Sequence, residues 1–238
     1  MDFTLKTYHH LLTALKAKGY TFQTFKDFLM AGHGNLRSMR SFHRPEPIEK
    51  IVVLRHDVDK KPGYALKMAR LESKMGINST YYFRAVPASW DETVIKEIAA
   101  LGHEIGYHYE DLAIMNGDKE KATKHFEQQL ERLRKLYPVE TICMHGSPRS
   151  RWDSRNMWSD HDYRKYGIIG EPYFDVDFNE VFYLTDTGRR WDGEKFSIRD
   201  KVNCCINLSF RSTHDIINRL AELPQKSNDQ YPSPALDR

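Results

Sequence analysis

Strand-like and helix-like segments alternate along this 238-residue chain, and that alternation constrains the fold more than any other feature. The clearest strand is 51–59, where the β-branched run IVV gives way to RHDVD. Further strands are predicted at 77–84, 103–109 and 140–146, each preceded by a segment with apolar residues at helical spacing. Units of this kind build a parallel sheet, either open or closed into a barrel.

The rest of the chain continues this pattern less regularly. Weaker candidates follow, with strands at 167–170, 180–184 and 206–209 and a last helix at 212–223. About seven parallel strands fit a (β/α) barrel better than an open sheet. We therefore predict one α/β barrel domain over 1–224, followed by a polar tail over 225–238.

Residues suited to capping mark the ends of the predicted helices. Thr4, Asp91 and Asp118 each precede a helical apolar stripe and can accept a hydrogen bond from the first turn. Gly19 and Gly76 follow such stripes, where a left-handed residue ends a helix easily. These positions set the expected helix boundaries.

Composition and charge argue against several classes of protein. Thirty-six Lys and Arg against 33 Asp and Glu leave a formal net charge of +3 without a basic stripe, so nucleic-acid binding is not expected. The sequence has no apolar run of about 18 residues and no signal-peptide core, so we expect a cytoplasmic protein without a membrane span. Cys143, Cys204 and Cys205 form no C-x-x-C, which favours reduced thiols.

Candidate catalytic residues follow the predicted strands, because reactive groups of parallel α/β folds gather at the carboxyl ends. Asp57 and Asp59 follow the first strand and point to the same side of an extended chain. Two such carboxylates repel each other unless a cation lies nearby, which favours a divalent metal. His108, after the third strand, would add a nitrogen ligand suited to zinc, iron, cobalt, nickel or manganese.

Structural explanations exist for these same residues. An isolated D-x-D is often a turn or a helix cap, although its place after a buried strand makes that reading less favourable here. His103 is better explained as a packed, hydrogen-bonded histidine than as a ligand. A second D-x-D, Asp175 and Asp177, lies in a weakly patterned region where a loop is favoured.

The run YLTDTGRRWDG gathers residues that suit a sugar ligand. Aromatic side chains can stack on sugar C–H surfaces, while Asp and Arg bind hydroxyl groups. The alternative is that Trp191 packs in the core and that the arginines are solvated. The candidate substrate-binding residues from this run are Tyr183, Asp186, Arg189 and Trp191.

Three motifs in order, RHDVD, STYYFR and GHEIGYH, resemble the polysaccharide deacetylase family, the NodB-like group also called carbohydrate esterase family 4. The resemblance is specific over 51–109 and extends to about residue 151. It implies a distorted, seven-stranded (β/α) barrel that uses a metal-bound water to remove acetyl groups from N-acetylated sugars. It also implies that Asp57 is the general base, with Asp59 and His108 as metal ligands.

The chain departs from the family pattern at the second metal histidine. The family places that histidine four residues after the first, where this chain has Leu112. Glu110, Asp111 and His145 are the candidate replacements. We prefer His145, because it lies at the end of the neighbouring strand, where the family's third motif falls.

Two later motifs also depart from the family. In HGSPRS the arginine follows Pro148 instead of preceding it, so Arg149 is assigned to substrate binding. The family also ends with a histidine that acts as general acid on a late strand. This chain has no histidine after Leu223, and His214 is the nearest substitute.

The leading interpretation is a metal-dependent hydrolase that removes an acetyl group from an N-acetylated sugar or glycan precursor. Its cofactor would be a divalent ion, zinc ahead of cobalt, nickel, manganese or iron. The missing histidines motivate an alternative, a carbohydrate-binding or scaffold protein that keeps the barrel without the chemistry. A glycosyltransferase ranks third, since no Gly-rich phosphate loop is present. A carbohydrate is the one partner that the sequence indicates. The sequence leaves the oligomeric state open.

Overall fold

The chain folds as a parallel α/β structure in the computed structural model, which describes residues 2–33, 50–147, 150–178, 180–186, 189, 191 and 210–220. Its strands form two sheets, and every pair of neighbours is parallel. The larger sheet follows chain order with β3 (Arg55–Val58), β4 (Thr80–Phe83), β5 (Glu104–Tyr109) and β6 (Ile142–Met144). The smaller sheet pairs β1 (Thr21–Gln23) with β2 (Ile51–Val53). The expectation of parallel strands is confirmed.

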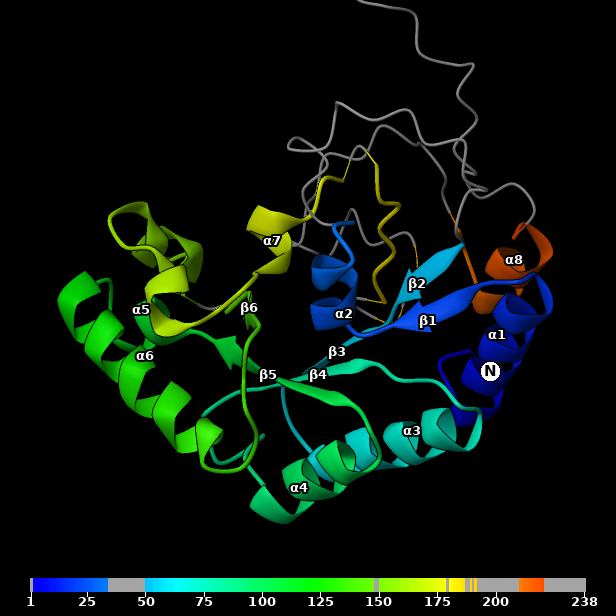
Figure 1. The fold of residues 1–238 in the computed structure, drawn as a ribbon, viewed down its shortest axis with the longest axis horizontal. Helices are drawn as coiled ribbons and strands as arrows, with labels where there is room; N and C mark the ends of the chain where they lie inside the picture. The colour runs from blue at the N-terminus through cyan, green and yellow to red at the C-terminus, as the bar shows by residue number, and fades with distance from the viewer. Residues whose placement is uncertain are drawn as a thin grey trace, which may run out of the picture.

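The strand predicted at 51–59 is two strands joined at Leu54. Residues 51–53 pair with β1, whereas 55–58 pair with β4. The Leu54 carbonyl still accepts a hydrogen bond from the Thr80 N–H at 3.0 Å, so pairing with the β4 side begins at the joint itself. This change of partner links the two sheets into the curved arc of strands seen in Figure 1.

Helices follow most of the strands. They are α1 (Leu5–Ala17), α2 (Phe25–Met30), α3 (Pro62–Lys74), α4 (Glu92–Ala100), α5 (Asp111–Ile114), α6 (Lys119–Arg134), α7 (Pro172–Asp175) and α8 (Thr213–Asn218). Two 3-10 helices, η2 (Ser154–Ser159) and η3 (Tyr163–Tyr166), lie between β6 and α7. The side chains of Thr4, Asp91 and Asp118 accept backbone N–H groups of the first turn at 3.1 Å, which confirms the predicted caps.

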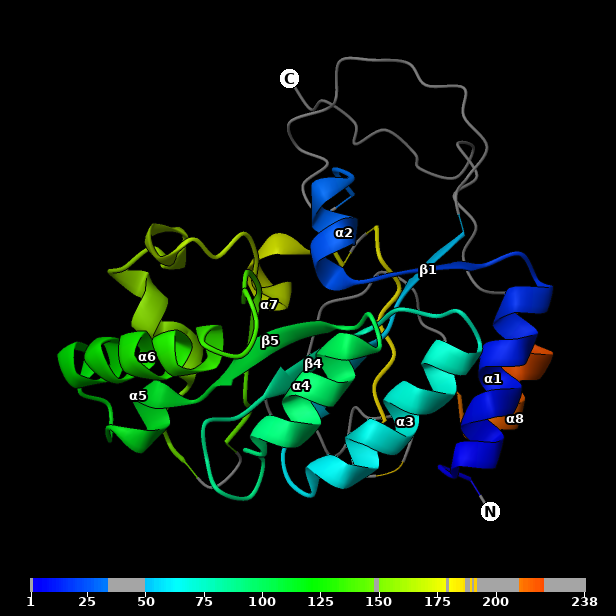
Figure 2. The same ribbon diagram turned by 60° about the horizontal axis from the view of Figure 1, so that its bottom comes forward.

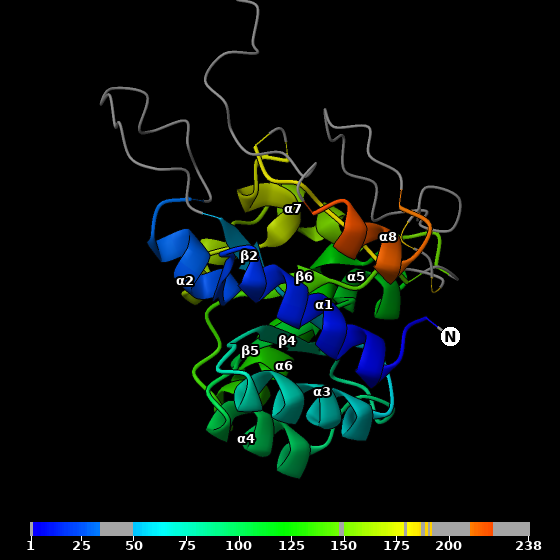
Figure 3. The same cartoon turned by 90° about the vertical axis from the view of Figure 1, so that its right-hand side faces the viewer.

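The helices lie on both sides of the strand arc. In Figure 1, α3, α4 and α6 run along its outer side, and α2 and α7 lie on the opposite side. Helices α1 and α8 lie side by side (Figures 1 and 2), where Leu11 and Leu15 pack with Ile216 and Leu220. Figure 3 places α3 and α4 at one end of the molecule and α7 and α8 at the other. Among the described residues, no helix is long and apolar enough to cross a bilayer.

The described part of the chain contains six strands, so the seven predicted strands are not shown there. The candidate at 167–170 contributes a single parallel bridge between Gly170 and Thr141. The candidate at 180–184 has irregular backbone. Its apolar side chains Phe182 and Leu184 pack against the α1–α8 cluster, which consists of Leu11, Leu15, Phe210, Ile216 and Leu220. The candidate at 206–209 lies outside the described residues. The described strands therefore form a curved, partial barrel wall.

The second glycine of the motif GHEIGYH, Gly106, is required by packing. It lies in β5 opposite Tyr82 of β4, and a Cβ atom at this position would overlap with the Tyr82 ring. Tyr82 is fully buried, and its hydroxyl forms a 3.0 Å hydrogen bond with Thr141. A glycine is therefore needed here so that β4 and β5 can pair.

A buried carboxylate fixes the outer face of β3. Glu72 of α3 is fully buried, and its two oxygens serve four partners. Tyr8 donates to Oε1 at 2.5 Å, and His56 Nε2 lies 2.8 Å from the same oxygen. Ser79 and Tyr81 donate to Oε2 at 2.5 and 2.8 Å. The network ties α1, α3, β3 and β4 together.

This network makes stability depend on pH in both directions. Burial would raise the pKa of Glu72, but the His56 charge and hydrogen bonds from His56, Ser79 and Tyr8 lower it to about 2. Burial would lower the pKa of His56, but Glu72 raises it above its usual value. Because folding lowers the pKa of Glu72, its ionised carboxylate stabilises the fold at pH values above its unfolded pKa. Because folding raises the pKa of His56, its protonated imidazole stabilises the fold at pH values below its unfolded pKa.

We therefore expect the contribution of this network to the free energy of unfolding to be largest between about pH 4.5 and 6.5, close to the ordinary pKa values of Glu and His. Below this window, about 3 kcal/mol of that contribution is lost as pH falls toward the Glu72 pKa. Above it, the contribution falls as pH rises through the raised His56 pKa. Urea unfolding of the wild type and of Glu72→Gln at pH 3, 5.5 and 8.5 measures both losses as the difference between the two proteins, and a difference that does not change with pH would contradict the expectation.

Candidate active site

The carboxyl ends of β3, β5 and β6 bring together the residues that the sequence singled out. Asp59 Oδ1 lies 3.0 Å from His145 Nδ1 and 3.5 Å from His108 Nε2. The two imidazole nitrogens are 3.2 Å apart. Asp57 Oδ2 lies at the edge of this group, 4.0 Å from His108 Nε2. The structure thus places His145 beside Asp59 and His108, and its role as a ligand stays a prediction.

The donor set fits a divalent transition-metal ion. Ligand bonds of about 2.0–2.2 Å in a tetrahedral site place neighbouring ligand atoms roughly 3–4 Å apart. The three atoms of Asp59, His108 and His145 have this spacing, and all lie within 4.8 Å of one another. Two imidazoles and one carboxylate are a common zinc-type ligand set.

The surroundings of His108 orient it for ligation. Its Nδ1 lies 2.9 Å from the backbone carbonyl of Cys143, and a carbonyl can only accept, so Nδ1 carries the proton. Nε2, the nitrogen left to bind an ion, therefore faces Asp59 and His145. A ligating histidine commonly donates its other nitrogen to a carbonyl in this way. The side chain is only 2% exposed, which keeps the ring in this orientation.

His145 is placed between two carboxylates. Its Nδ1 faces Asp59, and its Nε2 lies 3.9 Å from Glu110 Oε2. Glu110 in turn accepts from Arg84 at 2.6 Å and from Ser147 at 3.2 Å. Glu110 is thus engaged by a cation and a hydroxyl, which leaves Asp59 as the carboxylate closest to both histidines.

Asp59 and His108 stabilise each other's charged forms. Burial would raise the pKa of Asp59, but hydrogen bonds and charge attraction from His108 and His145 hold it far below its usual range. Burial would lower the pKa of His108, but the charges of Asp57 and Asp59 raise it. Asp59 is therefore ionised at neutral pH, and a proton and a metal ion compete for His108.

Arg55 is a further residue of the site, with no role predicted from the sequence. Its Nη2 lies 3.1 Å from Asp57 Oδ2, and the same group donates to the Tyr183 hydroxyl at 3.2 Å. The signal was present, because positions 55 and 57 of one strand share a face. Arg55 thus orients Asp57.

Cys143 also lies at the site, although its sequence pattern predicts only a reduced thiol. Its sulfur belongs with Asp57 and His108 to another group of donors that lie within 4.8 Å of one another. The thiol is fully buried and packs with Phe25 and Phe28. Asp57 is already paired with Arg55, so the group of Asp59, His108 and His145 fits an ion better.

A cavity of about 1080 Å³ opens beside Asp59 and His145. Lys60 and Arg84 line it from the ends of β3 and β4, and Ile114 lines it from α5. Arg151 and Trp152 complete the wall on the side of η2. Ligand sites commonly have volumes of about 300–1,000 Å³, so the cavity has room for a sugar and its neighbours.

The predicted substrate-binding residues are divided by the structure. Tyr183 lies next to Arg55 and hence to Asp57. Asp186 is exposed, and its carbonyl accepts the Arg189 N–H at 2.8 Å. Trp191 stacks on Phe3 with ring centroids 5.3 Å apart and packs in the α1–α8 cluster. None of these four lines the cavity beside Asp59, and Arg149 lies outside the described residues.

The remaining candidates have structural roles. His103 accepts the Ser79 N–H at 3.2 Å and faces the Ala69 carbonyl at 2.9 Å, as expected for a packed histidine. Asp175 of the second D-x-D is buried at the end of α7 and accepts the Tyr163 hydroxyl at 2.5 Å. Asp177 accepts the Glu180 N–H through its carbonyl at 2.9 Å, which fits the predicted loop.

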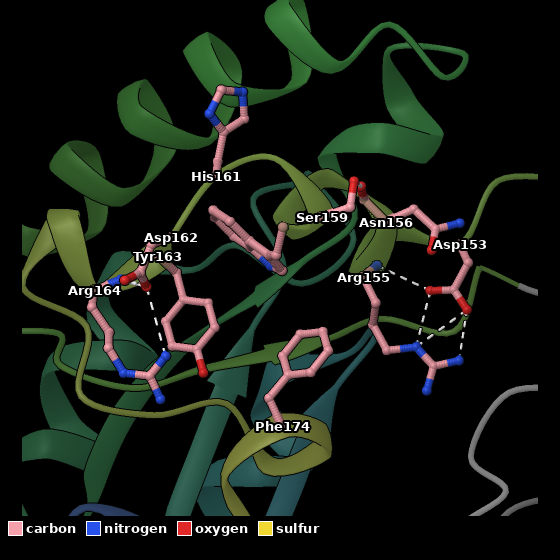
Figure 4. A pocket seen from close by; sticks show the side chains of 10 residues that line it. Asp153, Arg155, Asn156, Ser159, His161, Asp162, Tyr163, Arg164 and Phe174 are labelled. Atoms are coloured by element: carbon pink, nitrogen blue, oxygen red, sulfur yellow. Dashed lines mark hydrogen bonds and ion pairs between the residues drawn. The ribbon is translucent and has the colours of Figure 1, made fainter.

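A second hollow, of about 560 Å³, lies between η2, η3 and α7 (Figure 4). The ring of Tyr163 stacks near Phe174 there, with centroids 6.1 Å apart. Arg155 forms a bidentate pair with Asp153 in its wall, with the shortest contact at 2.6 Å. The strand ends that carry Asp59 and His108 do not line it. This hollow is therefore a weaker candidate for the reaction site.

Fold and site define the class of this protein: a parallel α/β protein with a candidate site for a divalent cation at the carboxyl ends of its strands. No family model matches the chain, and no curated protein sequence matches it. Among solved structures, it is similar to the Streptococcus pyogenes deacetylase PplD in complex with acetate, at 17% identity and a TM-score of 0.45. The similarity covers 58% of this chain and 60% of that one, so the chain spans less than two thirds of the deacetylase. A likeness of this extent identifies neither family nor reaction.

Proposed function

We propose that this protein is a metal-dependent hydrolase that removes an acetyl group from an N-acetylated sugar or glycan precursor. The observation that carries the proposal is the convergence of Asp59, His108 and His145 beside an Asp57 that Arg55 orients. The resemblance of RHDVD and GHEIGYH to polysaccharide deacetylases supports the same reaction and a carbohydrate substrate.

The residues divide the work between binding an ion and moving a proton. Asp59, His108 and His145 would hold the ion, with zinc favoured over cobalt, nickel, manganese or iron. A divalent cation held there polarises a carbonyl oxygen and makes water more acidic. Asp57 accepts the proton of the attacking water, since it lies at the edge of the ligand group and is not needed for ligation. Arg55 keeps its carboxylate turned toward the group.

A binding protein without turnover is the second candidate function. The leaving amine needs a proton from a positioned acid, and the sequence has no histidine after His214 to match the family's late histidine. Such a protein would keep the cavity and bind glycans without releasing acetate.

The proposal is tested by loading the purified protein with zinc, cobalt, nickel, manganese or iron and measuring bound metal and acetate release from N-acetylglucosamine oligomers. We expect one ion per chain and acetate release with at least one metal. Asp59→Ala and His108→Ala should lose the ion. His9→Ala, an exposed histidine of α1, is the matched control and should keep it. An ion retained by both site variants would contradict the ligand assignment, whereas glycan uptake by calorimetry without acetate release would favour the binding protein.

A further inference from the structure

The carboxylates of the cavity beside the proposed metal site already have partners. Asp59 lies 3.0 Å from His145 and 3.5 Å from His108 and is one of the proposed ligands of the ion. Glu110 is paired with Arg84 at 2.6 Å. Neither carboxylate is therefore left to neutralise a further cation of the described cavity wall.

Two cations of the same wall are not compensated. Lys60 directly follows Asp59 in the chain, and Arg151 precedes η2. Among the described residues, no carboxylate pairs with the Lys60 ammonium or with the Arg151 guanidinium. Both side chains belong to exposed residues, so both can reach a ligand in the cavity.

The position of Arg151 is partly fixed by an aromatic ring. Its guanidinium carbon lies 4.7 Å from the centroid of the Trp152 ring. The ring packs so closely on Gly117 that a Cβ atom there would overlap with it. Gly117 has a φ of +87°, a backbone conformation that also favours glycine. Cation–π contact with a well-packed ring reduces the freedom that Arg151 loses when it binds an anion.

The second hollow of the molecule shows the opposite arrangement. There, Arg155 pairs with Asp153 and Arg164 pairs with Asp162 (Figure 4). Arg164 also donates to Asp175. The arginines of that hollow are thus neutralised by the protein itself. The cavity beside Asp59 differs because its excess positive charge is left for a ligand.

We infer that the substrate carries an anionic group, a carboxylate or a phosphate, near the acetylated amine, and that Lys60 and Arg151 bind it. The inference rests on the proposed function, since it takes the cavity beside Asp59 and His145 as the substrate site. Arginine forms paired hydrogen bonds with the oxygens of either anion, and lysine adds a point charge. Neutral N-acetylated sugars would leave both cations without a partner.

The test compares three sugars with the metal-loaded protein: N-acetylglucosamine, its 6-phosphate and its uronic acid. Binding is measured by calorimetry and acetate release by steady-state kinetics, at low and high salt. We expect at least one anionic sugar to exceed the neutral one by about tenfold or more in kcat/KM, mainly through KM. The double variant Lys60→Gln/Arg151→Gln should reduce this preference to about one. Which anion is preferred distinguishes carboxylate from phosphate.

A matched control removes the same two charges elsewhere. Lys96 of α4 and Lys124 of α6 are exposed and do not line the cavity. Lys96→Gln/Lys124→Gln should retain the preference. Acetate release from all three sugars with equal kcat/KM would overturn the anion inference and leave the proposed function intact. Tight binding of anionic sugars without acetate from any sugar would overturn the proposed function and support the anion site. If the protein neither releases acetate nor binds anionic sugars tightly, both the proposed function and the anion inference are overturned.

Discussion

Replacing Asp57 with asparagine is expected to lower acetate release by about 10²–10⁴-fold, the usual contribution of a positioned base. Asparagine keeps the size of the side chain but cannot take a proton from water. Asp57 lies 4.0 Å from His108 Nε2, outside the closest group of ligand atoms, so bound metal should stay near one ion per chain. Initial rates and elemental analysis of the same preparations measure both quantities.

The control for this substitution makes the same chemical change at a helix cap. Asp118 caps α6, and asparagine caps helices about as well as aspartate. Asp118→Asn should therefore leave the rate within about twofold. If Asp57→Asn lost the ion together with its activity, Asp57 would be a ligand and the division of roles between Asp57 and Asp59 would be wrong. An unchanged rate would remove Asp57 from the reaction.

The parallel fold could be predicted because local signals agree with it. The apolar run at 51–53, the polar strand ends and the caps Thr4, Asp91 and Asp118 all report on local structure. The joint at Leu54 could not be predicted, because the change of partner from β1 to β4 depends on residues far away in the chain. β1 is too short, at three residues, to show an alternating pattern.

The proximity of Asp59, His108 and His145 could be predicted, because strand ends converge in parallel folds. Their role as ligands stays a prediction, and so does the preference for His145 over Glu110 and Asp111. The role of Arg55 follows from the alternation of side chains along a strand, which places Arg55 and Asp57 on the same face. Local composition could not show where Trp191 packs. An aromatic side chain among Asp and Arg residues suits a sugar, but the Trp191 ring stacks on Phe3. Nothing in the local sequence distinguishes those outcomes.

Replacing Glu72 with alanine is expected to lower the free energy of unfolding by about 3–5 kcal/mol, as when one partner of a buried ion pair is removed. Glu72 is fully buried, and the change would leave His56, Ser79 and the hydroxyls of Tyr8 and Tyr81 without their acceptor. Each buried donor without a partner carries its own desolvation cost. Urea unfolding at about pH 5.5, where this network is expected to be fully formed, measures the loss.

A matched control and a conservative variant separate the network from the mere loss of a carboxylate. Glu97 of α4 pairs with Arg70 at 2.6 Å, but both side chains are about half exposed, so Glu97→Ala should cost less than about 1 kcal/mol. Glu72→Gln keeps the volume and one oxygen acceptor but not the charge, and should fall between wild type and Glu72→Ala. Because His56 precedes Asp57 on β3, a folded Glu72→Gln protein should also show a lower rate of acetate release. A Glu72→Ala protein as stable as Glu97→Ala would show that the network does not support the strand that carries the site.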